Sequence, residues 1–88
     1  MKQLDEKQQM NLVRLVCNNK LDEAFKLESE LNKYFYVSEG VDRLNKALNA
    51  GEVCYENKFN TPFWIKNNIF LEQCFATGYK NAELKSSI

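Results

Sequence analysis

The sequence predicts an all-α fold, and two observations carry that prediction. Apolar residues recur at three- and four-residue spacing in separate stretches of the chain, as expected of helices that bury one face. Between these stretches lie an asparagine pair, a Ser-Glu-Gly triplet and a Thr-Pro pair, which are typical helix stops and starts. We therefore expect a short N-terminal helix, a bent helical hairpin and a long C-terminal helix that starts at Pro62.

The N-terminal helix is predicted from about Leu4 to Cys17. Asp5 and Glu6 lie in its first turn, where the positive end of the helix dipole favours negative charge. Asn18-Asn19 breaks this helix, and Asn19 is predicted to cap the next one.

The hairpin is predicted from two apolar stripes. The first runs from about Lys20 to Tyr36, although its aromatic tail has strand propensity, which leaves the end of that helix open. After a bend at Ser38–Gly40, a second stripe ends at Gly51, a residue suited to the left-handed position that follows a helix. The pattern leaves open whether residues 20–50 form one bent helix or two.

The C-terminal helix follows a predicted loop at Glu52–Asn60, in which Val53–Tyr55 has extended character. Thr61 is a good N-cap and Pro62 fits the first helical position, so the helix is predicted from Pro62 to about Leu84. Its apolar residues go nearly all round, which predicts burial on every side and hence contact with a second subunit. We expect residues 81–88 to fray.

Length and composition limit the classes of function. The 88 residues predict a single domain, and twelve basic and twelve acidic residues cancel, which disfavours binding to duplex nucleic acid. With no histidine and three cysteines without a CxxC pair, a zinc site made of Cys and His alone is excluded. We also expect no catalytic residues and no cofactor, because the sequence contains no nucleophile–base or phosphate-loop pattern.

The odd cysteine count and the polar N-terminus predict a reducing, cytoplasmic setting, with no signal peptide and no membrane span. The chain is rich in lysine and asparagine, which AT-rich codons encode, so an AT-rich genome such as that of a bacteriophage fits. Its compartment would then be the host cell cytoplasm. Ten of eleven aromatic residues lie from Tyr34 onward, a surplus typical of interfaces.

Candidate ligand-binding residues lie in two places. Trp64 can stack on a nucleobase, and Lys66 and Asn67 follow it near a predicted helix N-terminus, where anions are favoured; the alternatives are an interface anchor and a solvated helix face. Arg14, which follows Asn11 on the N-terminal helix, can stack on a ring or pair with phosphate. Its alternative is a surface ion pair with a nearby acidic residue.

These positions also carry a resemblance to a family. Met10-Asn11-x-Val13-Arg14, Pro62-x-Trp64 and Leu71-Glu72-Gln73-Cys74-Phe75 resemble elements of small phage proteins that sequester cyclic oligonucleotides and so blunt the bacterial defence called CBASS. Lys80 matches a basic residue of that family five positions after the Phe. The resemblance implies an all-helical homo-oligomer, often a hexamer, that holds cyclic di- and trinucleotides without cleaving them, and it assigns a ligand contact to Arg14.

Two alternatives stay open. Phe75-x-x-Gly78-Tyr79 resembles an element near the end of ribosome modulation factors, but those proteins are strongly basic and this chain is neutral. An inhibitor that masks a host protein with its aromatic surface is the other alternative.

Overall fold

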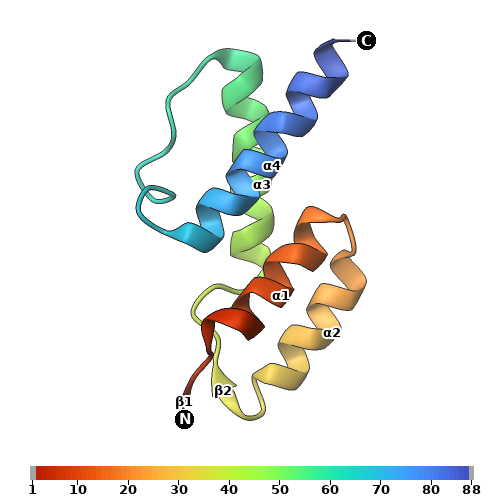
Figure 1. Cartoon of the computed structure of the whole chain (residues 1–88), viewed down its shortest axis with the longest axis vertical. Coiled ribbons are helices and arrows are strands. Elements are labelled where there is room, and N and C mark those ends of the chain that lie inside the picture. The colour runs from red at the N-terminus through yellow and green to blue at the C-terminus, as the bar shows by residue number, and fades with distance from the viewer. Residues whose placement is uncertain (1, 88) are drawn as a thin grey trace.

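The computed structural model describes residues 2–87, which form four helices and one pair of very short strands. The helices are α1 (Glu6–Cys17), α2 (Leu21–Leu31), α3 (Val41–Asn57) and α4 (Ile69–Ser86), and the strands are β1 (Lys2–Gln3) and β2 (Phe35–Tyr36). α1 and α2 form an antiparallel hairpin, while α3 and α4 lie side by side and run in the same direction (Figure 1). The predicted helical fold class is confirmed. Self-association stays a prediction.

The first helix begins and ends close to where the sequence predicts. Asp5 caps α1, because its Oδ1 accepts a hydrogen bond of 2.8 Å from the backbone N–H of Gln8. At the other end, the backbone N–H of Lys20 donates to the carbonyl of Leu15 at 2.8 Å. Asn19 lies in the left-handed region (φ 61) and closes α1. The prediction that Asn19 caps the next helix is therefore wrong, since the N-cap of α2 is Lys20.

The second helix is shorter than predicted, because α2 ends at Leu31 and does not reach Tyr36. Phe35 and Tyr36 instead pair in parallel with Lys2 and Gln3, so the strand propensity of these aromatic residues prevails over the helical stripe. Residues 20–50 thus contain α2 and the first part of α3, which are two helices separated by β2.

Two predicted boundaries around α3 are wrong. Gly51 does not end a helix, since α3 continues through it to Asn57, and the predicted loop at Glu52–Asn60 is mostly helical. The left-handed residue that ends α3 is Lys58 (φ 58). Gly51 lies instead where α3 meets α4, so its lack of a side chain serves packing and does not serve a turn.

The predicted start of the last helix at Pro62 is also wrong. Residues 58–68, called here the return segment, lead from the far end of α3 back to the start of α4, beside the two helices (Figure 1). Ile65 in this segment is completely buried, and Asn67 adopts a left-handed conformation (φ 67), so the chain bends where a helix was predicted. The N-cap of α4 is Asn68, whose Oδ1 accepts hydrogen bonds of 3.1 Å from the backbone N–H groups of Phe70 and Leu71.

At its other end, α4 stays helical through Ser86, beyond Asn81, where fraying was predicted; Ile88 lies outside the described residues. The helix is not buried on every side within one chain, because Ile69, Tyr79 and Leu84 are exposed. None of the helices within residues 2–87 combines the length and the apolar character that a membrane crossing requires.

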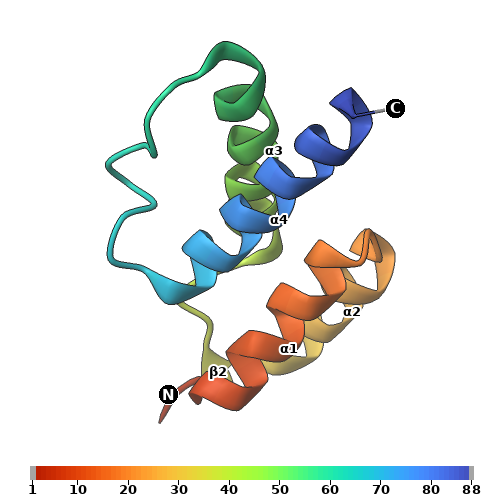
Figure 2. The same ribbon diagram turned by 45° about the horizontal axis from the view of Figure 1, so that its top comes forward.

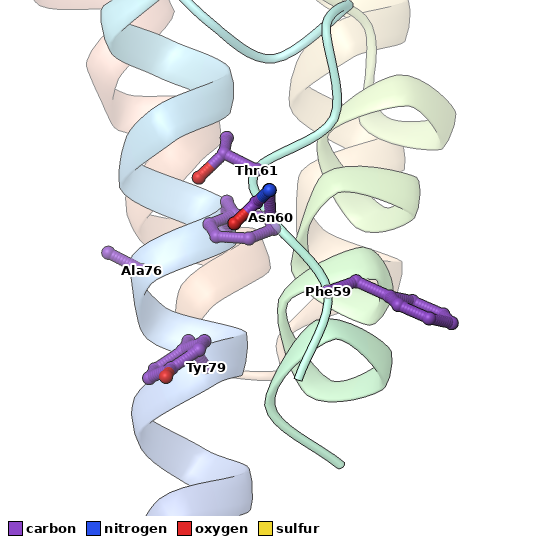
Figure 3. Close-up of a pocket in the computed structure, with 6 residues that line it drawn as sticks. Phe59, Asn60, Thr61, Ala76 and Tyr79 are labelled. Carbon is purple, nitrogen blue, oxygen red and sulfur yellow. The ribbon is translucent and has the colours of Figure 1, made fainter. Parts of the chain in front are cut away.

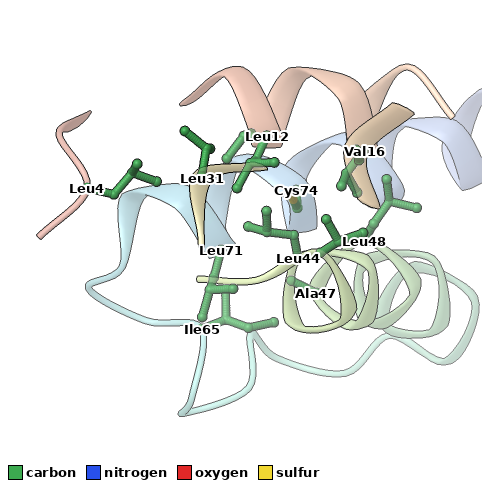
Figure 4. Packing of buried hydrophobic residues seen from close by; sticks show 13 residues of the cluster. Leu4, Leu12, Val16, Leu31, Leu44, Ala47, Leu48, Ile65, Leu71 and Cys74 are labelled. Carbon is green, nitrogen blue, oxygen red and sulfur yellow. The ribbon is translucent and has the colours of Figure 1, made fainter. Parts of the chain in front are cut away.

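One core cluster joins all four helices and the return segment. Leu12, Leu44 and Leu71, from α1, α3 and α4, have no exposed surface, and Ile65 reaches the same cluster from the return segment (Figure 4). α1 lies against both α2 and α4, as a view from a second direction also shows (Figure 2). The hairpin is therefore docked on the α3–α4 pair through α1.

Glycines allow the α3 and α4 backbones to approach closely. A Cβ atom added at Gly51 would meet the backbone of Phe75, and one added at Gly78 would meet the backbone of Leu48. No side chain fits at either place without moving the helices apart.

Candidate ligand-binding site

Trp64 meets α3 because its neighbour Ile65 fixes the return segment to the core. Ile65 is completely buried, whereas the indole of Trp64 is 39% exposed and lies on the surface of α3. The guanidinium carbon of Arg43 lies 5.8 Å from the centre of the Trp64 ring system, which is cation–π distance. Trp64 and Arg43 are thus brought together by the bend of the return segment.

A hollow of about 490 Å³ opens beside this pair and is lined by Asp42, Arg43, Lys46 and Trp64. This volume lies within the range of about 300–1,000 Å³ that small-molecule sites occupy. We call it the Trp64 hollow. Arg43 and Lys46 are three residues apart on α3, so both cationic side chains come from the same face of the helix.

Arg43 is held in place by the buried residue Glu39. The Nε atom of Arg43 lies 3.1 Å from Oε2 of Glu39 in an ion pair, and the side-chain amide of Asn68 donates to the other carboxylate oxygen at 2.9 Å. Gln9 of α1 donates to the backbone carbonyl of Glu39 at 2.7 Å. Glu39 therefore places a carboxylate beside Arg43 and links the starts of α3 and α4 to α1.

The charges of the hollow favour an anion mainly through Lys46. Part of the charge of Arg43 is compensated by Glu39, and Asp42 adds a carboxylate at the rim. Among residues 2–87, Lys46 forms no ion pair within 4.0 Å, so its ammonium group remains available to a ligand.

A second hollow, of about 440 Å³, lies between the return segment and α4 and is of a different kind. Uncharged residues line it: Phe59, Asn60, Thr61, Phe75, Ala76 and Tyr79. Tyr79 and Ala76 come from α4, and the ring of Phe59 points away from that helix (Figure 3). Tyr79 also packs edge-on against Tyr55, with ring centres 5.1 Å apart. This surface suits apolar contacts, and none of its lining side chains carries a positive charge that could pair with phosphate.

The site residues predicted from the sequence do not all converge. Arg14 is exposed on α1, where its Nη1 donates to Oδ1 of Asn11 at 2.9 Å, so the predicted pair lies together but away from the lining of the Trp64 hollow. Lys66 is exposed on the return segment, and Lys80 is exposed on α4. Neither lines the Trp64 hollow.

Asn67 lines a smaller hollow of about 240 Å³, whose other lining residues include Asn68, Ser38 and Glu39. Its left-handed conformation shapes the turn into α4. Asn67 therefore lines a different hollow from Trp64, although the two are three residues apart in the sequence.

Sequence reasoning selected Trp64 but missed Arg43 and Lys46. Arg43 is one of only two arginines, and the sequence drew attention to the other one, Arg14, because of the surrounding apolar residues. The pairing of Arg43 with Trp64 depends on the path of the return segment, for which no local signal exists. The three-residue spacing of Arg43 and Lys46 was the sequence signal that could have pointed to a basic helix face.

Within the described residues, no three Cys, Asp or Glu side chains gather in a way that could hold a metal ion. No family model matches the chain, and no curated protein or solved structure is significantly similar to it.

Proposed function

We propose that this protein binds and holds an anionic nucleotide ligand in the Trp64 hollow, and that the ligand is a cyclic di- or trinucleotide of the class implied by the sequence resemblance. The observation that supports this proposal is the exposed indole of Trp64 beside the cations of Arg43 and Lys46. An aromatic face stacks on a base, and an ammonium or guanidinium group pairs with its phosphate.

In this proposal the ligand is sequestered and not cleaved. The hollow offers one carboxylate, from Asp42, which suits hydrogen bonds from the amino groups of a base. A phage product of this kind would act in the host cell cytoplasm by lowering the free concentration of the signal. The exposed apolar residues Ile69 and Leu84 on α4 support the accompanying proposal of a homo-oligomer.

The single tryptophan provides a direct test. Trp64 is the only Trp in the chain, so a base stacked on it should quench all of the tryptophan fluorescence. We expect saturable quenching at micromolar cyclic dinucleotide or trinucleotide, and chromatography of the released nucleotide should recover it intact. Light scattering on the same samples reports the oligomeric state. No quenching with any member of a cyclic nucleotide panel would falsify the proposal.

Charge-removing variants locate the site. Lys46→Gln should weaken binding about tenfold or more, because a charge-assisted hydrogen bond contributes about 1.5–3 kcal/mol. Lys46 is the sharper choice than Arg43, whose removal also leaves the buried Glu39 without its ion pair. Arg14→Gln and Lys80→Gln are the matched controls and should bind normally. Loss of binding in Arg14→Gln with normal binding in Lys46→Gln would place the ligand at the position that the resemblance assigns.

A protein-binding function is the second candidate, and the exposure of Phe63 favours it. The Phe63 side chain is 91% exposed and the neighbouring Phe59 is 61% exposed, although both are large and apolar. Phe63→Ala should leave nucleotide binding unchanged if the ligand occupies the Trp64 hollow. If nucleotides do not bind to the wild-type protein, Phe63→Ala would test whether binding of a protein partner depends on the Phe63 side chain.

A further inference from the structure

A polar groove lies on the face of the molecule where the α1–α2 turn, α3 and α4 come together. Its volume is about 300 Å³. The lining residues are Val16, Cys17, Asn19, Asn45, Leu48, Asn49, Glu52, Asn81 and Lys85. Four of these nine residues are asparagines, whereas the chain as a whole contains eleven asparagines in 88 residues. We call this site the asparagine groove.

The groups of the asparagine groove suit a peptide-like zwitterion. Within residues 2–87, the side-chain amides of the four asparagines form no hydrogen bond to protein, so their donors and acceptors are available. Glu52 and Lys85 bring one negative and one positive charge, with Oε2 and Nζ 4.0 Å apart. A ligand that carries amide, carboxylate and ammonium groups can pair with each of these.

A reactive arrangement of two thiols lies beside the groove. Cys17, the last residue of α1, lines the groove and is half-buried, whereas Cys74 of α4 is completely buried. The two sulfur atoms lie 3.9 Å apart. A disulfide requires a distance of about 2.05 Å, so the two sulfur atoms must move about 2 Å closer together to form one. One thiol is thus accessible, and the other is in reach behind it.

The environment of Cys17 favours its thiolate. The side-chain hydrogen bond with Cys74 lowers the pKa of Cys17 to about 6, against the opposing effect of burial, and the hydroxyl of Thr77 lowers it further. The same interaction raises the pKa of Cys74. Since thiolates and not thiols attack disulfides, Cys17 is the sulfur expected to react first.

We propose that the asparagine groove binds a low-molecular-weight disulfide of the glutathione type, which oxidises Cys17 and Cys74 to an intramolecular disulfide. The Cys17 thiolate attacks one sulfur of the bound disulfide, forms a mixed disulfide and releases one thiolate. The Cys74 thiol then gives its proton to the first released thiolate and attacks the Cys17 sulfur, which breaks the mixed disulfide and releases the second sulfur as a thiolate. Overall, two cysteine thiols are oxidised and one disulfide is reduced to two thiols, so atoms and electrons balance.

The cross-link would join the end of α1 to α4 across residues 17–74. It would fix the docking of the hairpin on the α3–α4 pair. The cross-link would lie at the C-terminal end of α1, whereas the strand pair lies near its N-terminal end (Figure 1). This proposal is independent of the nucleotide site, because the Trp64 hollow and the asparagine groove share no lining residue.

The first experiment uses the wild-type protein and oxidised glutathione. Intact-mass analysis and thiol titration without reductant should show loss of two of the three thiols, with no glutathione retained and no covalent dimer. Peptide mapping should find Cys17 linked to Cys74, and Cys54 should stay free. The proposal is overturned if all three thiols survive, or if the mapped link involves Cys54.

Two variants resolve the order of steps. Cys74→Ser should accumulate the mixed disulfide on Cys17, because no second thiol remains to displace glutathione. Cys17→Ser should not react, since Cys74 is buried, and Cys54→Ser serves as the matched control that behaves as wild type. Circular dichroism checks that each variant is folded. A Cys17→Ser protein that reacts as fast as wild type overturns the proposal, and the wild-type peptide map decides if a variant does not fold.

Recognition by the groove is tested by comparing two disulfides. Lys85→Gln should slow the reaction with oxidised glutathione about threefold, the size expected of one exposed charge contact. The same substitution should leave the rate with hydroxyethyl disulfide, which is uncharged, nearly unchanged. Equal effects on both rates would contradict a role for the groove in binding the reagent.

Discussion

The contact between α3 and α4 and the contact between α2 and the start of α3 are made in different ways. α3 and α4 approach backbone to backbone at Gly51 and Gly78, where a side chain has no room. α2, in contrast, buries only Ala24 and Leu31, and near Gly40 at the start of α3 it places the flexible side chain of Glu28. A backbone contact cannot adjust to added volume, whereas a long side chain can move away. The comparison predicts a rigid contact between α3 and α4 and an adaptable contact between α2 and the start of α3.

The largest expected effect is that of a methyl group at Gly78. Gly78→Ala would place a Cβ against the backbone of Leu48, so the helices must separate, and we expect a loss of about 3 kcal/mol in the free energy of unfolding. Gly40→Ala is the matched control. There the added atom meets only the end of the Glu28 side chain, so the change should be within about 0.5 kcal/mol.

Urea denaturation of the two variants measures both values. Similar losses in the two proteins would show that the α3–α4 contact is less rigid than the glycine packing indicates. A loss confined to Gly78→Ala would sharpen the distinction between the two contacts.

An intermediate effect is expected at Glu39, because this residue links the hairpin to the α3–α4 pair. Glu39→Ala removes the carboxylate that pairs with Arg43 and Asn68 but keeps the backbone carbonyl that Gln9 contacts. The polar groups left without partners should cost about 2 kcal/mol of stability. Glu30→Ala is the control, since its ion pair with Lys33 is exposed and should contribute little. Equal melting temperatures for the two variants would argue against the linking role.

The smallest effects are expected at the helix caps. Asn68→Ala removes two hydrogen bonds to the start of α4, as well as the contact with Glu39, and should cost about 1.5 kcal/mol. Asp5→Ala removes a single exposed hydrogen bond at the start of α1 and should cost about 0.5 kcal/mol. Thermal unfolding followed by circular dichroism can rank the two variants. A larger loss of stability for Asp5→Ala than for Asn68→Ala would contradict this prediction.

The sequence predicts the hairpin half better than the α3–α4 half, and the reason is physical. α1 has local signals at both ends, namely Asp5 as a cap and an asparagine in the left-handed conformation at Asn19. At Gly51 and Thr61–Pro62, the local signals are overruled by contacts with distant parts of the chain. Gly51 is needed for the approach of α4, and burial of Ile65 bends the chain after Pro62.

The candidate site divides in the same way. Trp64 could be selected from its residue type alone, but its neighbours Arg43 and Lys46 depend on where the return segment lies. The closeness of Cys17 and Cys74 was equally hidden, because 57 positions separate them in the sequence, and an odd number of cysteines gave no reason to pair them. The chemistry of a single side chain can be predicted from its residue type. Which distant residues become its neighbours in the structure cannot.

The docking of α1 has a consequence for how the chain folds as it is synthesised. Leu12 and Val16 of α1 are synthesised well before Leu71 and Cys74 of α4, which belong to the same core cluster. Until α4 emerges, the newly made hairpin has an uncovered apolar face that chaperones can bind. The order in which the helices are translated thus leaves the apolar face of α1 uncovered until α4 has been made.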